Sequence, residues 1–227
     1  IWLRGPVVDG RTGDGITMAR LVGANVAGMH AVAGNAPYLP DVPPINQFSG
    51  PDELKQGRCA LAQPWLWVNH EGKRFFNESR GAVFVDVYNA MTSAGGVLYT
   101  IFDQSMIDDL INKGAVLPFN AIVLAGVPLK ALPKTLEMGY ERGWAFKADT
   151  VKEFAKTGVD EEFSRKPEHL RAFNLNKGPY YALKGVRCFF LTLGGVTVTP
   201  QFEAKNPQGN VIPNLYVVGQ DIGGLYD

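Results

Sequence analysis

Five prolines fall within the short stretch from Gly34 to Pro51, and they restrict what this chain can fold into more than any other feature. They are Pro37, Pro40, Pro43, Pro44 and Pro51. Each proline has a fixed φ angle and no backbone N–H, so a regular helix cannot run through this stretch. We therefore expect a boundary between two parts of the chain here.

A helix is expected before the prolines, over residues 14 to 29. Apolar and small residues recur there near the 3.6-residue period of a helix that packs on one face. Asp14 is the candidate N-cap. The glycines and alanines in its second half would let the helix lie close against a neighbouring element.

Strands and helices alternate after the prolines. The aromatic and β-branched residues of 65–76 predict a β-hairpin with its turn at Glu71-Gly72. Residues 97–102 predict a short buried strand. Asp103 then caps a predicted helix that ends at Gly114.

The second half of the chain continues this mixed pattern. A capping box at Thr150 predicts a helix that stops at Gly158. Residues 188–199 and 214–219 predict strands, and 206–210 predict a turn. With 26 glycines and 15 prolines, the chain is too rich in turn residues for a helical bundle. The expected fold class is α+β.

Charge and cysteine content exclude several classes of protein. The 22 Lys+Arg balance the 22 Asp+Glu, so the chain offers no general attraction for nucleic acid or an anionic membrane surface. No apolar run approaches the roughly 18 residues of a membrane helix. Cys59 and Cys188 have no partner at metal-ligand spacing, so we expect two buried thiols and no metal site.

The end of the last predicted strand is a candidate ligand site. Gln220, Asp221 and the pair Gly223-Gly224 follow it, and open α/β folds bind ligands beyond the carboxyl ends of their strands. Glycine lets a cofactor approach the backbone, and a carboxylate can accept hydrogen bonds from ribose or ribityl hydroxyls. A simple glycine turn after an edge strand would give the same pattern, so both interpretations stay open.

Six short motifs occur in a fixed order along the chain. They are TGDGI at 12–16, GKRFFNE at 72–78, GVDEEF at 158–163, GPYYA at 178–182, TLGG at 192–195 and IPNLYVVG at 212–219. In this order they resemble the FAD-dependent fumarate reductase and succinate dehydrogenase flavoprotein family. The similarity is to its soluble, single-chain branch, which includes urocanate reductases and ketosteroid dehydrogenases, and it spans nearly the whole chain.

The resemblance implies a capping (clamp) domain with partial FAD-domain strands at both ends. Residues 1–37 would then be a fragment of the FAD-binding domain, 38–187 the capping and substrate domain, and 188–227 the returning FAD-binding segment. The dinucleotide-binding motif Gly-x-Gly-x-x-Gly has no match, since Gly10–Gly15 has the wrong spacing. We therefore expect a piece of a longer flavoprotein that does not hold FAD alone and is itself inactive.

For the full-length protein, the resemblance implies an FAD-dependent oxidoreductase acting on CH–CH bonds. It would reduce or introduce a conjugated C=C bond of a small organic acid or enone by hydride transfer at flavin N5. The implied partners are a small-molecule substrate and an electron-donor protein or haem domain. A ketosteroid-type dehydrogenase is an alternative within the same chemistry, and a non-catalytic α+β binding module is the alternative from another class. No compartment follows from the sequence.

The resemblance also implies residues that contact the flavin. Thr192, Gly194 and Gly195 match the strand that passes the flavin ring. Gly219 and Gln220 match the step that meets the ribityl chain, where the family usually has an acidic residue after the glycine. Asp221 can take over that acidic role.

Two side chains are candidates for proton transfer. Fumarate reductases use an arginine a few residues after the RF-x-N-E motif, and Arg80 follows it here at a spacing shorter by two. The alternative is that Arg80 is an ordinary surface arginine. Tyr181 could supply a phenol proton or could simply pack in the core. Arg74, within the motif, is expected to pair with a structural carboxylate.

One departure from the family changes the expected substrate. Fumarate reductases have a histidine directly before the T-x-G-G motif that binds the substrate carboxylate, whereas Leu191 stands here. Together with Phe189 and Phe190, Leu191 would form an apolar wall. Fumarate itself is therefore disfavoured, because a lost charge-assisted hydrogen bond costs about 1.5–3 kcal/mol.

Overall fold

The computed structural model describes residues 12–43, 46–117, 123–150 and 178–224. The chain divides into two compact units, each of which is described by itself. Unit 1 extends from Gly34 to Cys188, and unit 2 contains the described residues up to Ala33 and from Phe189 onward. That unit 1 is a capping domain and unit 2 part of an FAD-binding domain remains a prediction.

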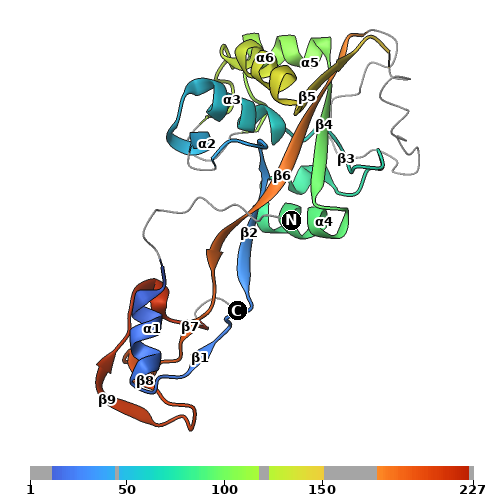
Figure 1. Cartoon of the computed structure of the whole chain (residues 1–227). Helices are drawn as coiled ribbons and strands as arrows, with labels where there is room; N and C mark the ends of the chain where they lie inside the picture. Colours follow the sequence, from blue (N-terminus) through green and yellow to red (C-terminus); the bar gives the residue numbers. More distant parts are fainter. Residues whose placement is uncertain (1–11, 44–45, 118–122, 151–177, 225–227) are drawn as a thin grey trace. The chain divides into compact units, whose positions relative to one another are not determined.

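Unit 1 is built on a five-stranded sheet (Figure 1). Its strands are β2 (Val32–Tyr38), β3 (Leu66–Val68), β4 (Val97–Asp103), β5 (Ala145–Ala148) and β6 (Tyr180–Thr192). The order is β2-β6-β4-β3, and β5 also pairs with β6. The long strand β6 is therefore central, with β4 antiparallel along it from Tyr180 to Val186.

Apolar side chains of β4 point to both faces of the sheet, so each face carries an apolar cluster. Leu98 and Phe102 lie in the main core, whereas Ile101 belongs to a separate small cluster with Val68 and Ala182. Successive side chains of a strand point to opposite faces, so the small cluster lies on the face away from the main core.

Helices cover the main-core face. They are α2 (Asn46–Ser49), α3 (Asp52–Leu61), α4 (Phe84–Ser93), α5 (Gln104–Asn112) and α6 (Leu132–Arg142), with the 3₁₀ turn η1 (Glu78–Arg80) before α4. The packing of α3 against α6 is close, because a Cβ on Gly57 would lie 2.4 Å from the methyl group of Thr135. The largest fully buried side chains include Trp67, Trp144 and Phe102.

Unit 2 is smaller and has a modest core. Its elements are α1 (Asp14–Leu21), β1 (Val26–Ala27), β7 (Gly195–Val196), β8 (Glu203–Lys205), β9 (Val211–Tyr216) and the 3₁₀ turn η2 (Gly219–Asp221). β1 pairs with β7 and β8 with β9, both antiparallel. The buried apolar residues are Ala19, Ala24, Val196, Ala204, Val217 and Ile222.

Several predicted elements are confirmed. β4 and α5 form as expected, and the Asp103 carboxylate caps α5 by accepting a hydrogen bond of 2.9 Å from the backbone N–H of Met106. The turn at 206–210 is closed by Asn206, whose backbone N–H donates to the carbonyl of Asn210. Both cysteines are buried free thiols.

Other predictions were wrong in their boundaries. The first helix ends at Leu21, and its N-cap is Gly13 in a left-handed conformation, so Asp14 is the first helical residue. The chain cannot continue this helix because Gly23 also has a positive φ, of 95°. The predicted hairpin at 65–76 is shorter than expected: its second strand is a single bridge between Val68 and Arg74.

The proline-rich stretch and the last strands also differ in detail. The exclusion of helix from residues 34–51 was wrong for the proline-free turn α2, while Pro37 lies inside β2. The strand predicted at 188–199 begins eight residues earlier, at Tyr180, and stops before Gly194. The strand predicted at 214–219 is β9, which ends at Tyr216. The helix predicted from Thr150 to Gly158 lies almost wholly outside the described residues.

Candidate functional site

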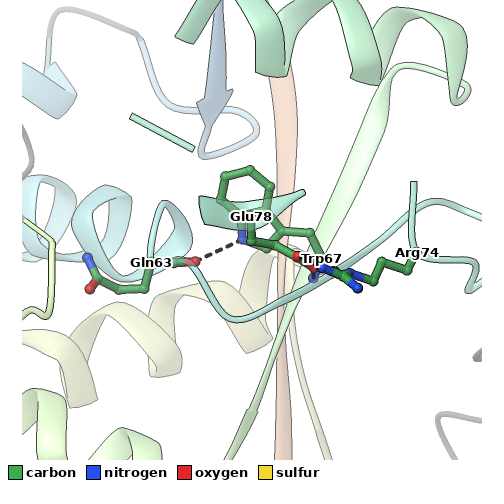
Figure 2. Close-up of polar contacts among 4 residues, drawn as sticks. All are labelled: Gln63, Trp67, Arg74 and Glu78. Carbon is green, nitrogen blue, oxygen red and sulfur yellow. Dashed lines mark hydrogen bonds and ion pairs between the residues drawn. The ribbon is translucent and has the colours of Figure 1, made fainter. Parts of the chain in front are cut away.

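The segment carrying the RF-x-N-E motif is held by one buried carboxylate (Figure 2). Glu78 has a fully buried side chain and accepts a hydrogen bond of 3.0 Å from the backbone N–H of Trp67. Its carboxylate also accepts from Arg74 Nε, with 2.9 Å to each oxygen. Arg74 thus pairs with a structural carboxylate, as predicted.

The indole of Trp67 ties the same segment to the turn that follows α3. Its Nε1–H donates to the backbone carbonyl of Gln63 at 2.9 Å (Figure 2), and its ring stacks on Phe76 with centroids 5.8 Å apart. Gly81 completes the packing, because a Cβ there would lie 2.7 Å from the indole. These contacts position η1, the turn that ends at Arg80.

Arg80 lies at the surface at the end of η1. Its side chain is 64% exposed and forms an ion pair with Asp86 in α4. The immediate environment is therefore that of a salt-bridged surface arginine, which was the alternative to a proton donor. The catalytic role of Arg80 stays a prediction.

Tyr181 lies in β6 with its side chain in the main core, only 7% exposed. Its hydroxyl donates a hydrogen bond to Gln104 Oε1, and Gln104 Nε2 donates in turn to Asp108 at 2.8 Å. Burial is the main cause that raises the pKa of Tyr181, and the Asp108 carboxylate raises it further. The phenol is thus held in its neutral, donating form, but its proton is committed to an amide oxygen.

The six predicted flavin contacts all belong to unit 2. Gly194 and Gly195 are buried at the start of β7. A Cβ on Gly194 would lie 2.5 Å from Met29 Cα, and one on Gly195 would lie 2.4 Å from the Asp221 carbonyl oxygen. Close backbone packing alone therefore explains both glycines, and contact with a flavin stays a prediction for them.

The other predicted contacts are more open. Thr192 and Gln220 are exposed, and Gly219 has a φ of 71° with no atom within 4 Å of where its Cβ would stand. The Asp221 carboxylate lies against the first turn of α1, since a Cβ on Gly15 would be 2.0 Å from its Oδ2. The turn η2 thus places the accessible backbone of Gly219, the side-chain amide of Gln220 and the carboxylate of Asp221 next to one another in sequence.

This turn fits the chemistry of a hydroxyl-bearing cofactor chain. The empty space above Gly219 is what close approach to backbone requires, and the left-handed φ there would strain any other residue. The carboxylate of Asp221 and the amide of Gln220 are suitable partners for hydroxyl groups. Gly219, Gln220 and Asp221 are therefore the residues that would hold such a group.

Other kinds of site find no support in the part of the chain that the structure describes. No group of three or more His, Cys, Asp or Glu side chains there could hold a metal ion. None of the described helices combines the length and apolar character needed to cross a membrane. The Cys59 side chain is fully buried, and burial raises the pKa of its thiol to about 12, which disfavours the reactive thiolate.

Sequence reasoning missed the partners that position these residues. Asp86, which pairs with Arg80, and Gln104, which accepts from Tyr181, were not singled out. Glu78 was quoted only as part of a motif. The chain between Arg74 and Glu78 is not helical, so the four-residue spacing alone did not predict their contact.

Comparison with known proteins identifies the family. The model of the FAD binding domain family matches residues 6–227. The vinyl phenol reductase of Lactiplantibacillus plantarum is 28% identical over 97% of this chain and 48% of its own length. The fumarate reductase (cytochrome) of Shewanella frigidimarina is 29% identical over 96% of this chain and 35% of its own.

Solved structures agree with this fold. The 3-ketosteroid Δ1-dehydrogenase of Sterolibacterium denitrificans has a TM-score of 0.61 at 19% identity, covering 97% of this chain and 43% of that one. The open conformation of a flavocytochrome c3 fumarate reductase has a TM-score of 0.51 at 21% identity, covering 98% and 36%. The chain spans less than half of each of these relatives. It belongs to the FAD binding domain family of the fumarate reductase-like oxidoreductases, whose cofactor is FAD.

Proposed function

We propose that this chain is part of an FAD-dependent oxidoreductase that reduces, or introduces, a conjugated C=C bond of a small organic acid or enone. The observation that carries the proposal is the family match over residues 6–227. The open turn at Gly219, with Asp221 beside α1, supports it because those groups suit the cofactor of that family. When bound, FAD supplies the capacity to accept and donate hydride at N5.

Within this proposal, unit 1 is the capping and substrate domain and unit 2 belongs to the FAD-binding domain. Gly219, Gln220 and Asp221 would bind hydroxyls of the cofactor chain, and Thr192, with Gly194 and Gly195, would lie along the ring. Arg80 and Tyr181 are the candidate proton donors. For Tyr181 this requires the phenol to exchange its Gln104 acceptor for the substrate.

The substrate would be less charged than fumarate. Leu191 and Phe189 are half-buried residues of β6 that precede Thr192, and Leu191 stands where the family's fumarate reductases have histidine. Apolar side chains there favour a substrate with an apolar body. A haem domain or another electron-donor protein is the proposed reductant, in line with the flavocytochrome among the structural neighbours.

Anaerobic turnover of the full-length protein tests this function. The substrates are a panel of enoates with aliphatic and aromatic bodies, and the donor is reduced viologen. We expect viologen oxidation with an apolar enoate to exceed that with fumarate. Loss of turnover on every enoate would contradict the proposal.

Two variants in that assay test the proton donors. Removal of a general acid lowers turnover by about 10²–10⁴-fold, so we expect such a loss in Arg80→Gln or in Tyr181→Phe. The matched controls are Arg20→Gln and Tyr216→Phe, exposed residues of unit 2 that have no predicted role. Turnover unchanged in both test variants would remove Arg80 and Tyr181 from the mechanism.

A ketosteroid-type dehydrogenase is the second candidate. Leu191 and Phe189 suit a large apolar substrate, and relatives include the 3-oxosteroid 1-dehydrogenase of Mycolicibacterium smegmatis, 28% identical over 96% of this chain. Oxidation of a 3-ketosteroid with an artificial electron acceptor would favour this candidate over enoate reduction. A non-catalytic binding module would show turnover in neither assay.

A further inference from the structure

A cavity of about 330 Å³ opens in unit 1 where β4 begins. The pairing of β4 with β6 ends at Val97, which faces Val186. Arg187 therefore continues β6 beyond the start of β4 and lines the cavity together with Gly96, the residue just before β4. The cavity lies wholly within unit 1 and contains none of the residues assigned above to cofactor or substrate.

The guanidinium group of Arg187 is held in a defined place beside this cavity. Its central carbon lies 5.9 Å from the centroid of the Tyr88 ring, a distance that permits a cation–π interaction. It also lies next to Gly96, since a Cβ at that position would be in van der Waals contact with Arg187 Nε, 3.5 Å away. Arg187 itself is half-buried.

Within the described part of the chain, no residue accepts a hydrogen bond from this guanidinium. Arg187 Nε is buried and has no acceptor, and no carboxylate forms an ion pair with Arg187 among the described residues. A buried donor without an acceptor costs about 1–3 kcal/mol. Nε is out of reach of the cavity, whereas the terminal Nη groups of Arg187 are not among the buried unpaired atoms, so they are the donors that an external acceptor would bond.

The remaining walls restrict what that acceptor can be. Leu39, Val42, Val97 and Val186 make the cavity largely apolar, which leaves an inorganic anion without matching contacts. Asp41 also lines it, and its carboxylate would repel a second negative charge on a ligand. A volume of about 330 Å³ is at the small end of ligand sites, which run from about 300 to 1,000 Å³.

We propose that this cavity binds a small monocarboxylate with an apolar body. The carboxylate accepts hydrogen bonds from the Arg187 guanidinium, the geometry in which arginine and carboxylate pair most strongly. The apolar body lies against the valine and leucine side chains. This site does not depend on the oxidoreductase function proposed above, because it shares no residue with it.

Calorimetric titration with three probes tests the proposal directly. Butyrate is the small monocarboxylate, butyramide is its uncharged counterpart, and succinate carries a second carboxylate. We expect saturable binding of butyrate, at least about tenfold weaker binding of butyramide, and weaker binding of succinate than of butyrate. Equal affinity for butyrate and butyramide in the unaltered chain would overturn the proposal.

Variants locate the binding in this cavity. Arg187→Met should weaken butyrate binding by about tenfold or more, whereas Arg142→Met, an exposed arginine at the end of α6, should leave it unchanged. Asp41→Asn should raise the affinity for succinate. If Arg187→Met does not fold, Arg187→Lys replaces it, with an expected loss of several-fold because lysine cannot form the bidentate pair. Equal losses in the Arg187 and Arg142 variants would show a nonspecific anion effect and sink the proposal.

Discussion

Arg74 Nε lies 2.9 Å from each carboxylate oxygen of Glu78, and the Glu78 side chain is fully buried. The same carboxylate accepts from the backbone N–H of Trp67, so it joins the two sides of the turn that carries the RF-x-N-E motif. Removing one partner of a buried pair costs about 3–5 kcal/mol, because the other charge is left uncompensated.

We therefore expect Glu78→Ala to lower the free energy of unfolding by about 3–5 kcal/mol, measured by urea denaturation. Asp86→Ala is the matched control, since it removes the carboxylate from an ion pair whose arginine is 64% exposed. Exposed pairs contribute about 0–1 kcal/mol. Similar losses in the two variants would show that burial does not distinguish these pairs.

The cap of α5 gives a second prediction. Asp103 Oδ1 accepts hydrogen bonds from the Met106 backbone N–H at 2.9 Å and from the Ser105 hydroxyl at 2.6 Å. Asp103→Ala should cost about 1–2 kcal/mol of stability, as measured by urea denaturation. Asp14→Ala, in the first turn of a helix with no side-chain cap hydrogen bond, should cost less. Equal costs would contradict the role of the hydrogen bond.

The close packing at β7 predicts that Gly195 tolerates no side chain. A Cβ there would lie 2.4–2.7 Å from backbone atoms of Asp221 to Gly223, which cannot move as a side chain could. We expect Gly195→Ala to destabilise unit 2 by about 3 kcal/mol, seen as faster hydrogen exchange in peptides of that unit.

Gly209→Ala is the control for this prediction. Gly209 has a φ of 84° but no atom near its missing Cβ, so only the backbone strain of about 1 kcal/mol should appear. If the two alanine variants exchange at the same rate, the packing of β7 against η2 is looser than the structure indicates.

Burial of Cys59 predicts a pH dependence of stability. The pKa of its thiol is raised from 9.0 to about 12, so above pH 9 the unfolded chain loses a proton that the folded chain keeps. This contribution to stability is complete below pH 9 and is lost as the pH rises toward 12.

The slope of the free energy of unfolding against pH, measured by urea denaturation between pH 8 and about 10.5, should therefore be less steep in Cys59→Ala than in the unaltered chain. The difference should approach about 1.4 kcal/mol per pH unit. Loss of packing lowers the stability of the variant at every pH and does not change the slope. Parallel curves for the two proteins would contradict the raised pKa.

Local signals in the sequence predicted the elements that depend on neighbouring residues. Asp103 lies directly before the helix it caps, so α5 could be located from sequence alone. The first part of β6 could not be located in this way, because Gly185 interrupts its run of strand-forming residues. The glycine is needed because its missing side chain makes room for Pro37 and Leu61, which are distant in sequence.

The candidate site shows the same limit. The family resemblance predicted Gly194, Gly195 and Asp221 as cofactor contacts, and the structure brings Gly195 against the backbone of Asp221. The contact of Asp221 with Gly15 joins opposite ends of the chain, and no local pattern carries it. Helices α3 and α6 were missed although both begin at prolines and α3 has Asp52 and Glu53 in its first turn.

The pairing of β1 with β7 has a consequence for synthesis on the ribosome. Val26 faces Val196, so the first strand of unit 2 leaves the exit tunnel long before its partner has been translated. At about 5–20 residues per second the wait is roughly 10–30 s. Unit 1 is complete earlier, because its sheet needs no residue after β6. Nascent chains should therefore acquire structure from the middle outward, and unit 2 is the part that a chaperone would have to protect.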